Sequence, residues 1–110
     1  MILNTSQLTE IKDLFDENFS ALLEVFLHDS ALYVEKICAW KSDAEHSSVI
    51  MAAHTLKSTS ANLGLDELAW QCTLIEAACS DQQHEQITEL VSSIGQVYQQ
   101  SITALQQAVG

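Results

Sequence analysis

Hydrophobic residues recur along this chain at the three- and four-residue spacing that is typical of amphipathic α-helices. The helices that this pattern predicts span about residues 5–14, 17–41, 43–64 and 66–79, and then run from the 80–83 segment to about residue 108. No stretch alternates polar and apolar residues for long enough to indicate a β-strand. The chain contains no proline and three glycines, whereas a sandwich or barrel needs many turns. We therefore expect an all-α fold.

The segments between the predicted helices carry residues that cap helices. Residues 42–45, SDAE, form a capping box in which Ser42 accepts from the Glu45 amide and the Glu45 side chain accepts from the Ser42 amide. Residues 80–83, SDQQ, repeat that pattern, and Gly64 is the residue type preferred where a helix ends. Long helices with one apolar stripe each and short connections favour an antiparallel up-down four-helix bundle, preceded by the short N-terminal helix.

Composition and charge narrow the class of protein. The 110 residues suffice for one hydrophobic core, so we expect a single domain over 1–110. Fifteen acidic residues against four basic ones give a net charge of −11, which repels nucleic acid and anionic lipid. The sequence has no glycine-rich phosphate loop, no signal peptide and no apolar run near the roughly 20 residues that a membrane span requires. We expect a cytoplasmic protein whose partner is another protein.

The predicted 43–64 helix contains His54, whose side-chain direction relative to the core face can be calculated. The residues of this helix that share one side, and are expected to form its core face, are Val49, Ala52, Ala53, Leu56, Ser60 and Leu63. At about 100° per residue, the mean direction of that face lies roughly 150° from His54, so His54 points outward. Lys57, Ser58 and Ala61 follow at i+3, i+4 and i+7 and share the face of His54.

A neutral imidazole nitrogen is a nucleophile, and a neighbouring ammonium group stabilises a phosphoryl group placed on it. His54 beside Lys57 therefore fits a reactive or ligand-binding histidine. A solvated surface histidine fits the same pattern, and the residues alone leave both interpretations open.

The cysteines, the remaining histidines and the tryptophans are explained by packing or by solvent exposure rather than by a functional site. Cys72 and Cys79 lie on the apolar stripe of the 66–79 helix, so we expect buried, unreactive thiols, and Cys38 has no partner in the pattern. Three histidines fall on separate helices or at helix starts and are not expected to converge into a metal site: His28, His46 and His84. We expect Trp40 and Trp70 to pack in the core or between helices.

Residues 53–64, AHTLKSTSANLG, resemble the signature of histidine-containing phosphotransfer (HPt) domains, A-H-x-L-K-G-x-[SA]-x-x-x-G. The positions that match are Ala53, His54, Leu56, Lys57, Ser60 and Gly64. The segment LDELAWQCTLIEAA after the motif resembles the next helix of the family, and LLEVFLHDSALYVEKICAW before it resembles the family's preceding long helix. The resemblance thus covers nearly the whole chain, and the family is a four-helix bundle with a short leading helix.

The resemblance implies a phosphoprotein of two-component signal transduction. In the family, the histidine accepts a phosphoryl group from an aspartate of one receiver domain and passes it to an aspartate of another. His54 would be the phosphoacceptor and Lys57 the residue that stabilises the phosphate. The partners would be receiver domains of a hybrid sensor kinase and of a response regulator. The carrier would be a monomer without kinase activity, cofactor or metal of its own, because Mg²⁺ is expected on the receiver.

Docking of the receiver would involve residues around His54. Ser58 departs from the family's usual glycine, which affects how closely a receiver approaches, and Ala61 is the next small residue on that face. Glu76 falls where the family often has a polar residue near the histidine, although a solvated charge explains it equally well. Leu27 lies off the apolar stripe, like Leu23 and Val34, and either docking or contacts with the leading helix explain it.

Two other functions remain compatible with the residues. The first is a helical adaptor that keeps the bundle but never phosphorylates His54. The second is the dimerisation and phosphoacceptor segment of a sensor kinase, which would be a dimer attached to an ATP-binding domain. Because the chain begins at methionine and accounts for one bundle, we expect the free carrier rather than the kinase segment.

Overall fold

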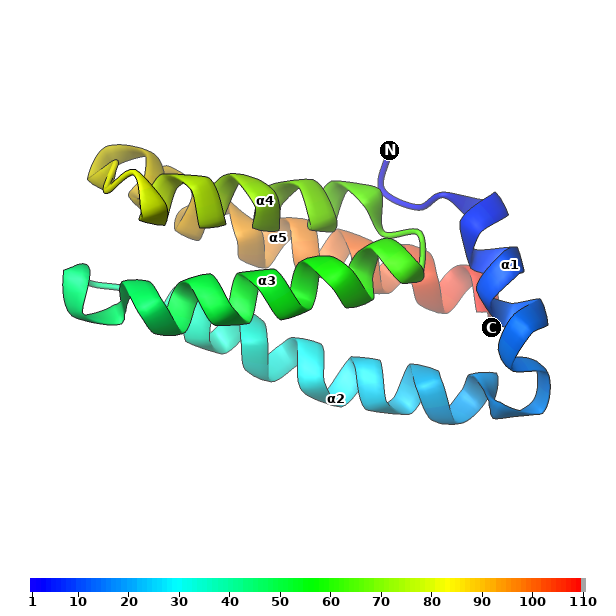
Figure 1. Cartoon of the computed structure of the whole chain (residues 1–110). Helices are drawn as coiled ribbons and strands as arrows, with labels where there is room; N and C mark the ends of the chain where they lie inside the picture. The colour runs from blue at the N-terminus through cyan, green and yellow to red at the C-terminus, as the bar shows by residue number, and fades with distance from the viewer. Residues whose placement is uncertain (110) are drawn as a thin grey trace.

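The computed structural model describes residues 1–109, and within them all regular structure is helical. The α-helices are α1 (Thr5–Phe15), α2 (Phe19–Cys38), α3 (His46–Asn62), α4 (Asp66–Ser80) and α5 (His84–Val109), with single 3₁₀ turns at Asp16–Asn18 and Asp43–Glu45. Figure 1 shows α2 to α5 lying lengthwise beside one another, while α1 crosses one end. Its colour gradient runs in opposite directions along successive long helices. The all-α prediction is confirmed.

The core follows the predicted periodicity. Each long helix packs against two others, since α2 contacts α3 and α5 while α4 contacts the same pair. All six residues expected on the core face of α3 are at most 3% exposed. A hydrogen bond of 2.8 Å between Ser30 Oγ and Tyr98 Oη joins α2 to α5 inside the core. The prediction for the tryptophans is half right, because Trp40 packs against the core but Trp70 is 55% exposed.

The caps differ from the predicted capping boxes. Glu45 does reach back, but its carboxylate accepts hydrogen bonds from the Lys41 amide and the Ser42 hydroxyl rather than from the Ser42 amide. The turn at Asp43–Glu45 is 3₁₀, so α3 itself begins at His46. The SDQQ prediction is wrong, because Ser80 is the last residue of α4 and does not cap α5.

Gly64 ends α3 as predicted and also anchors the leading helix. The Gly64 and Leu65 amides donate to the carbonyls of Ala61 and Ser60, the pattern of a Schellman motif. This motif requires a left-handed residue, and Gly64 has a φ of +81°. The Asn4 amide then donates to the Gly64 carbonyl at 2.7 Å, which fixes the start of α1 against the end of α3.

The substitution Gly64→Ala should lower the free energy of unfolding by about 2 kcal/mol or more. Alanine would have to adopt the left-handed backbone conformation of Gly64, which its side chain disfavours. Its Cβ would also lie 2.4 Å from the Asn4 carbonyl oxygen, a backbone atom that cannot rotate away. Gly95→Ala is the matched control, because a Cβ there meets nothing within 4 Å inside α5. It should raise the free energy by about 0.5–1 kcal/mol. Urea denaturation measures both, and equal effects of the two substitutions would contradict this account of Gly64.

Two of the three thiols are buried in the core, as predicted. Cys72 and Cys79 are at most 2% exposed, and Cys38 is exposed near the end of α2. Burial, together with the nearby Glu76 carboxylate and against the smaller opposing effect of Lys57, raises the pKa of the Cys72 thiol to about 12. Burial also raises the pKa of Cys79. Neither thiol ionises near neutral pH, so neither is a nucleophile there.

At pH 8, a chromogenic disulfide reagent should therefore modify Cys38 promptly in the folded chain, because Cys38 is the exposed thiol. Cys72 and Cys79 should react only when denaturant exposes them. The variant Cys38→Ser should show no prompt reaction, and modification of folded Cys72 as fast as of Cys38 would contradict the buried placement.

Candidate functional site

His54 lies in the middle of α3 and points out of the bundle, as predicted from the helical geometry. Its side chain is 65% exposed. Its neighbours Ala53 and Leu56 are fully buried against the core, so the backbone that carries the imidazole is held rigidly. An exposed ring on a packed helix is accessible to a macromolecule and still fixed in direction.

Glu76 joins His54 and Lys57 from the neighbouring helix. Its Oε1 lies 3.4 Å from His54 Nδ1 and 3.1 Å from Lys57 Nζ. Both contacts have the distance of an ion pair but not the direction of a hydrogen bond, and this oxygen makes no hydrogen bond within residues 1–109. Glu76 is 21% exposed and Lys57 is 32% exposed, so water screens the pair only partly. The three charged side chains form one cluster across the α3–α4 junction.

The position of Glu76 gives the two imidazole nitrogens of His54 different roles. A carboxylate oxygen facing Nδ1 favours the neutral tautomer that carries its proton on Nδ1. The lone pair then lies on Nε2, on the side of the ring away from Glu76. Nε2 is therefore the ring nitrogen with an available lone pair, and Lys57 places a positive charge one helical turn away.

Ser58 and Ala61 have small side chains that leave the surface beside His54 accessible. Both are exposed, at the positions expected from their spacing on α3. The Ser58 hydroxyl donates to the His54 carbonyl at 3.3 Å, so it is turned back onto its own helix. Neither side chain extends over the imidazole ring, and the face is free of bulky groups at these two positions.

Leu27 is not among the residues that line the groove between α2 and α3. Leu27 is partly buried and packs against the core. At about 100° per residue, it lies more than about 100° around α2 from Val25, Asp29 and Tyr33, which line a groove shared with α3. Val34, which the sequence also placed off the core stripe, is 8% exposed and belongs to the core.

An apolar groove lies between α1, α2 and α3, beside His54. Its volume is about 260 Å³. Thr55, which follows His54 in the chain, lines it together with Thr59. The other lining residues are Ile11, Phe15, Leu22, Val25, Phe26, Asp29, Ser30, Tyr33, Asn62 and Leu63. This surface was not predicted from the sequence, although an additional apolar residue at position 25 of an amphipathic helix was a signal for it, and Val25 is 58% exposed in the structure.

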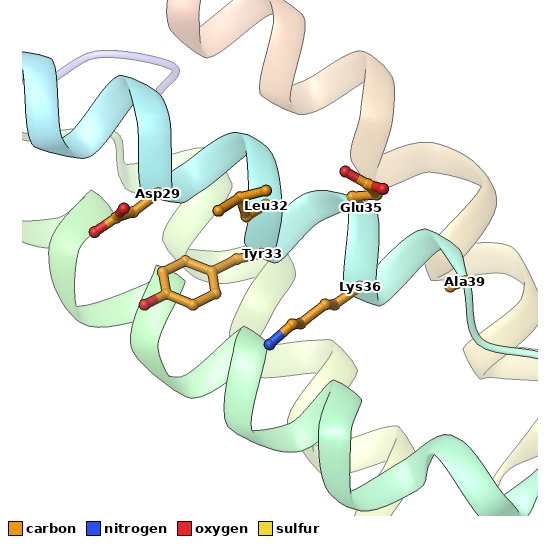
Figure 2. A pocket seen from close by; sticks show the side chains of 6 residues that line it. All are labelled: Asp29, Leu32, Tyr33, Glu35, Lys36 and Ala39. Atoms are coloured by element: carbon orange, nitrogen blue, oxygen red, sulfur yellow. The ribbon is translucent and has the colours of Figure 1, made fainter.

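A second hollow continues along the outer side of α2 (Figure 2) and shares Asp29 and Tyr33 with the groove. Its lining is Asp29, Leu32, Tyr33, Glu35, Lys36 and Ala39. Figure 2 shows Tyr33 and Lys36 reaching from α2 toward α3, whereas Glu35 points the other way. The uncovered surface next to α3 thus combines apolar side chains with the ammonium group of Lys36.

The expectation that the histidines stay apart is wrong for two of them. His46 and His84 meet at the other end of the bundle from α1, where Asp43 lies between them. His28 remains separate, exposed on α2 beside Asp29. The sequence could not show this convergence, because His46 and His84 belong to different helices.

Comparison with known proteins identifies the family of the chain. Among the described residues, no helix is long and apolar enough to cross a membrane. No curated protein and no solved structure gives a significant match to the chain. The sequence model of the Hpt domain matches residues 21–108, a span that includes His54, Lys57 and Glu76. This match covers most of the chain, so the protein belongs to the Hpt domain family.

Proposed function

We propose that this protein is a phosphoryl carrier of a two-component phosphorelay, in which Nε2 of His54 is the phosphoacceptor. Membership of the Hpt family implies histidine phosphotransfer by a carrier module that is not an enzyme. The observation that carries the assignment to His54 is its outward imidazole, with Glu76 at Nδ1 and Lys57 beside both. The donor is a receiver domain of a hybrid sensor kinase, and the acceptor is the receiver domain of a response regulator.

The transfer needs no proton movement on this chain. The Nε2 lone pair attacks the phosphorus of an aspartyl phosphate, the bond between phosphorus and the aspartyl oxygen breaks, and the electron pair leaves on the aspartate carboxylate. The proton stays on Nδ1, so the phosphorylated ring is an imidazolium whose positive charge the Glu76 carboxylate stabilises. The Lys57 ammonium stabilises the phosphoryl oxygens. Transfer to the second receiver is the reverse of these steps.

The receiver supplies what this face lacks. Mg²⁺ binds through several oxygen ligands, whereas the carboxylate nearest His54 is already paired with Lys57. We therefore assign the metal to the receiver and no cofactor to the carrier. Ser58 and Ala61 let the receiver approach Nε2, and the groove lined by Val25 and Thr59 provides apolar contact area beside it. We further propose that the carrier acts in the cytoplasm as a monomer, without kinase activity of its own.

His54→Gln should abolish phosphorylation by a phosphorylated receiver domain and leave the bundle folded, since an exposed helical position tolerates glutamine. The wild-type label should be lost in acid and retained in base, because a nitrogen–phosphorus bond is acid-labile. Radiolabelled phosphate transfer followed by gel electrophoresis measures the labelling of each chain and the stability of the label in acid and base.

Incubation with ATP alone is the control and should leave the wild-type chain unlabelled. Persistent labelling of His54→Gln would refute the assignment of the phosphoacceptor. A wild-type chain that binds receivers but takes no label from any of them would instead support the adaptor.

Ser58→Arg should lower the transfer rate by about tenfold or more, because a long cationic side chain would cover the approach to Nε2. Thermal stability should stay nearly unchanged, since Ser58 is exposed. Thr103→Arg is the matched control, because it adds the same charge on an exposed position of α5, which does not pack against α3. Transfer kinetics with one receiver measure the effect, and equal rates for the two variants would show that receivers dock elsewhere.

A further inference from the structure

The end of the bundle opposite α1 holds a cluster of metal-binding side chains from two helices that are distant in sequence. His46 is the first residue of α3, His84 is the first residue of α5, and Asp43 opens the 3₁₀ turn before α3. Figure 1 shows α3 and α5 beginning at this same end. One ligand atom from each of the three residues lies within 4.8 Å of the others.

The separations are close to those that a metal ion imposes on its ligands. His46 Nε2 lies 3.6 Å from Asp43 Oδ1, and neighbouring ligands of a tetrahedral zinc ion stand about 3.3 Å apart. His84 Nε2 lies 2.5 Å from the same oxygen, as a direct hydrogen bond. Ligation requires this pair to open by less than about 1 Å, and both side chains are more than half exposed, so a small adjustment of the Asp43 carboxylate is enough. Two imidazoles and a carboxylate suit zinc, nickel, cobalt or copper rather than Mg²⁺ or Ca²⁺.

His46 provides an observation that the hydrogen bond between His84 and Asp43 does not explain. Its Nε2 is buried and makes no hydrogen bond within the part of the chain that the structure describes, although it faces the Asp43 carboxylate. A buried ring nitrogen without a partner costs free energy in the folded state. A cation between the three groups would satisfy this nitrogen and the carboxylate at once.

Trp40 holds the two imidazoles in place. Its ring stacks on that of His46 at a centroid distance of 6.0 Å and an angle of 14°, and it lies 6.0 Å from the ring of His84. The imidazoles themselves meet edge to face at 5.8 Å. Packing against an indole limits the rotation of both imidazoles, and a site with pre-oriented ligands loses less entropy on binding.

Nearby acidic residues compensate for the helix dipoles at this end of the bundle. The positive ends of the α3 and α5 dipoles act against a cation. Acidic residues offset these dipoles. Asp43 and Glu45 lie in the 3₁₀ turn before α3, and Glu85 lies in the first turn of α5.

We propose that Asp43, His46 and His84 form a binding site for a divalent transition metal of the zinc class, with water completing the coordination. The site links the start of α3 to the start of α5. It is separate from the phosphoacceptor, because His54 lies eight residues further along α3, about 12 Å along the helix axis. Its role is to stabilise this end of the bundle, and it does not depend on the phosphotransfer function.

The test is titration of the tag-free 110-residue chain with ZnCl₂, monitored by Trp fluorescence and thermal unfolding. One equivalent should change the emission, because Trp40 contacts both ligating rings. The Tm should rise by about 5 °C or more when free zinc exceeds the Kd by about 100-fold. No response to zinc, or an equal response to Mg²⁺, would overturn the proposal.

The variants His84→Gln and Asp43→Asn should each weaken zinc binding by about tenfold or more. Asp43→Asn preserves a hydrogen-bond acceptor for His84 and removes the anionic ligand, so it remains informative if His84→Gln fails to fold. His28→Gln is the control, because it removes an exposed histidine of α2 outside the cluster. Wild-type zinc affinity in Asp43→Asn would overturn the proposal, as would an equal loss in His28→Gln.

Discussion

The close packing of α3 against α4 is the constraint on which the site depends. Ala52 and Ala53 are buried on the core face of α3, and their small side chains allow neighbouring helices to approach closely. This approach lets Glu76 of α4 contact both His54 and Lys57 of α3. A bulkier core face would separate the helices, and the imidazole would then lose the carboxylate that distinguishes its two nitrogens.

The charge cluster at His54 adds little to stability, and its geometry matters for the proposed phosphotransfer. Ion pairs that are partly exposed contribute little to the free energy of folding, and Lys57 is 32% exposed. The value of the cluster lies in its geometry, because one carboxylate oxygen contacts both the Nδ1 side of the ring and the ammonium group. In the proposed transfer, the same carboxylate leaves Nε2 as the reacting nitrogen and holds the Lys57 ammonium near the phosphoryl group.

The two ends of the bundle are closed by different chemistry. At one end, backbone hydrogen bonds through Gly64 and Asn4 hold α1 across the long helices. At the other end, side chains do this work, since Trp40 packs against His46 and His84 where α2 ends and α3 and α5 begin. The end that is held by backbone hydrogen bonds requires a particular residue type only at Gly64, which has a left-handed conformation. The end that is held by side chains depends on each of the three packed rings.

The sequence by itself determined the helices, the core face of α3, and the outward direction of His54 with Lys57 beside it. These features follow from the fixed rotation per residue within one helix, so spacing along the chain is enough to predict them. Only the tertiary structure decided that Glu76 contacts His54, that Leu27 packs against the core, that Trp70 is exposed, and that His46 meets His84. Each of these depends on how neighbouring helices are rotated and how closely they approach, and the periodicity of a single helix carries no information about its rotation relative to a neighbour.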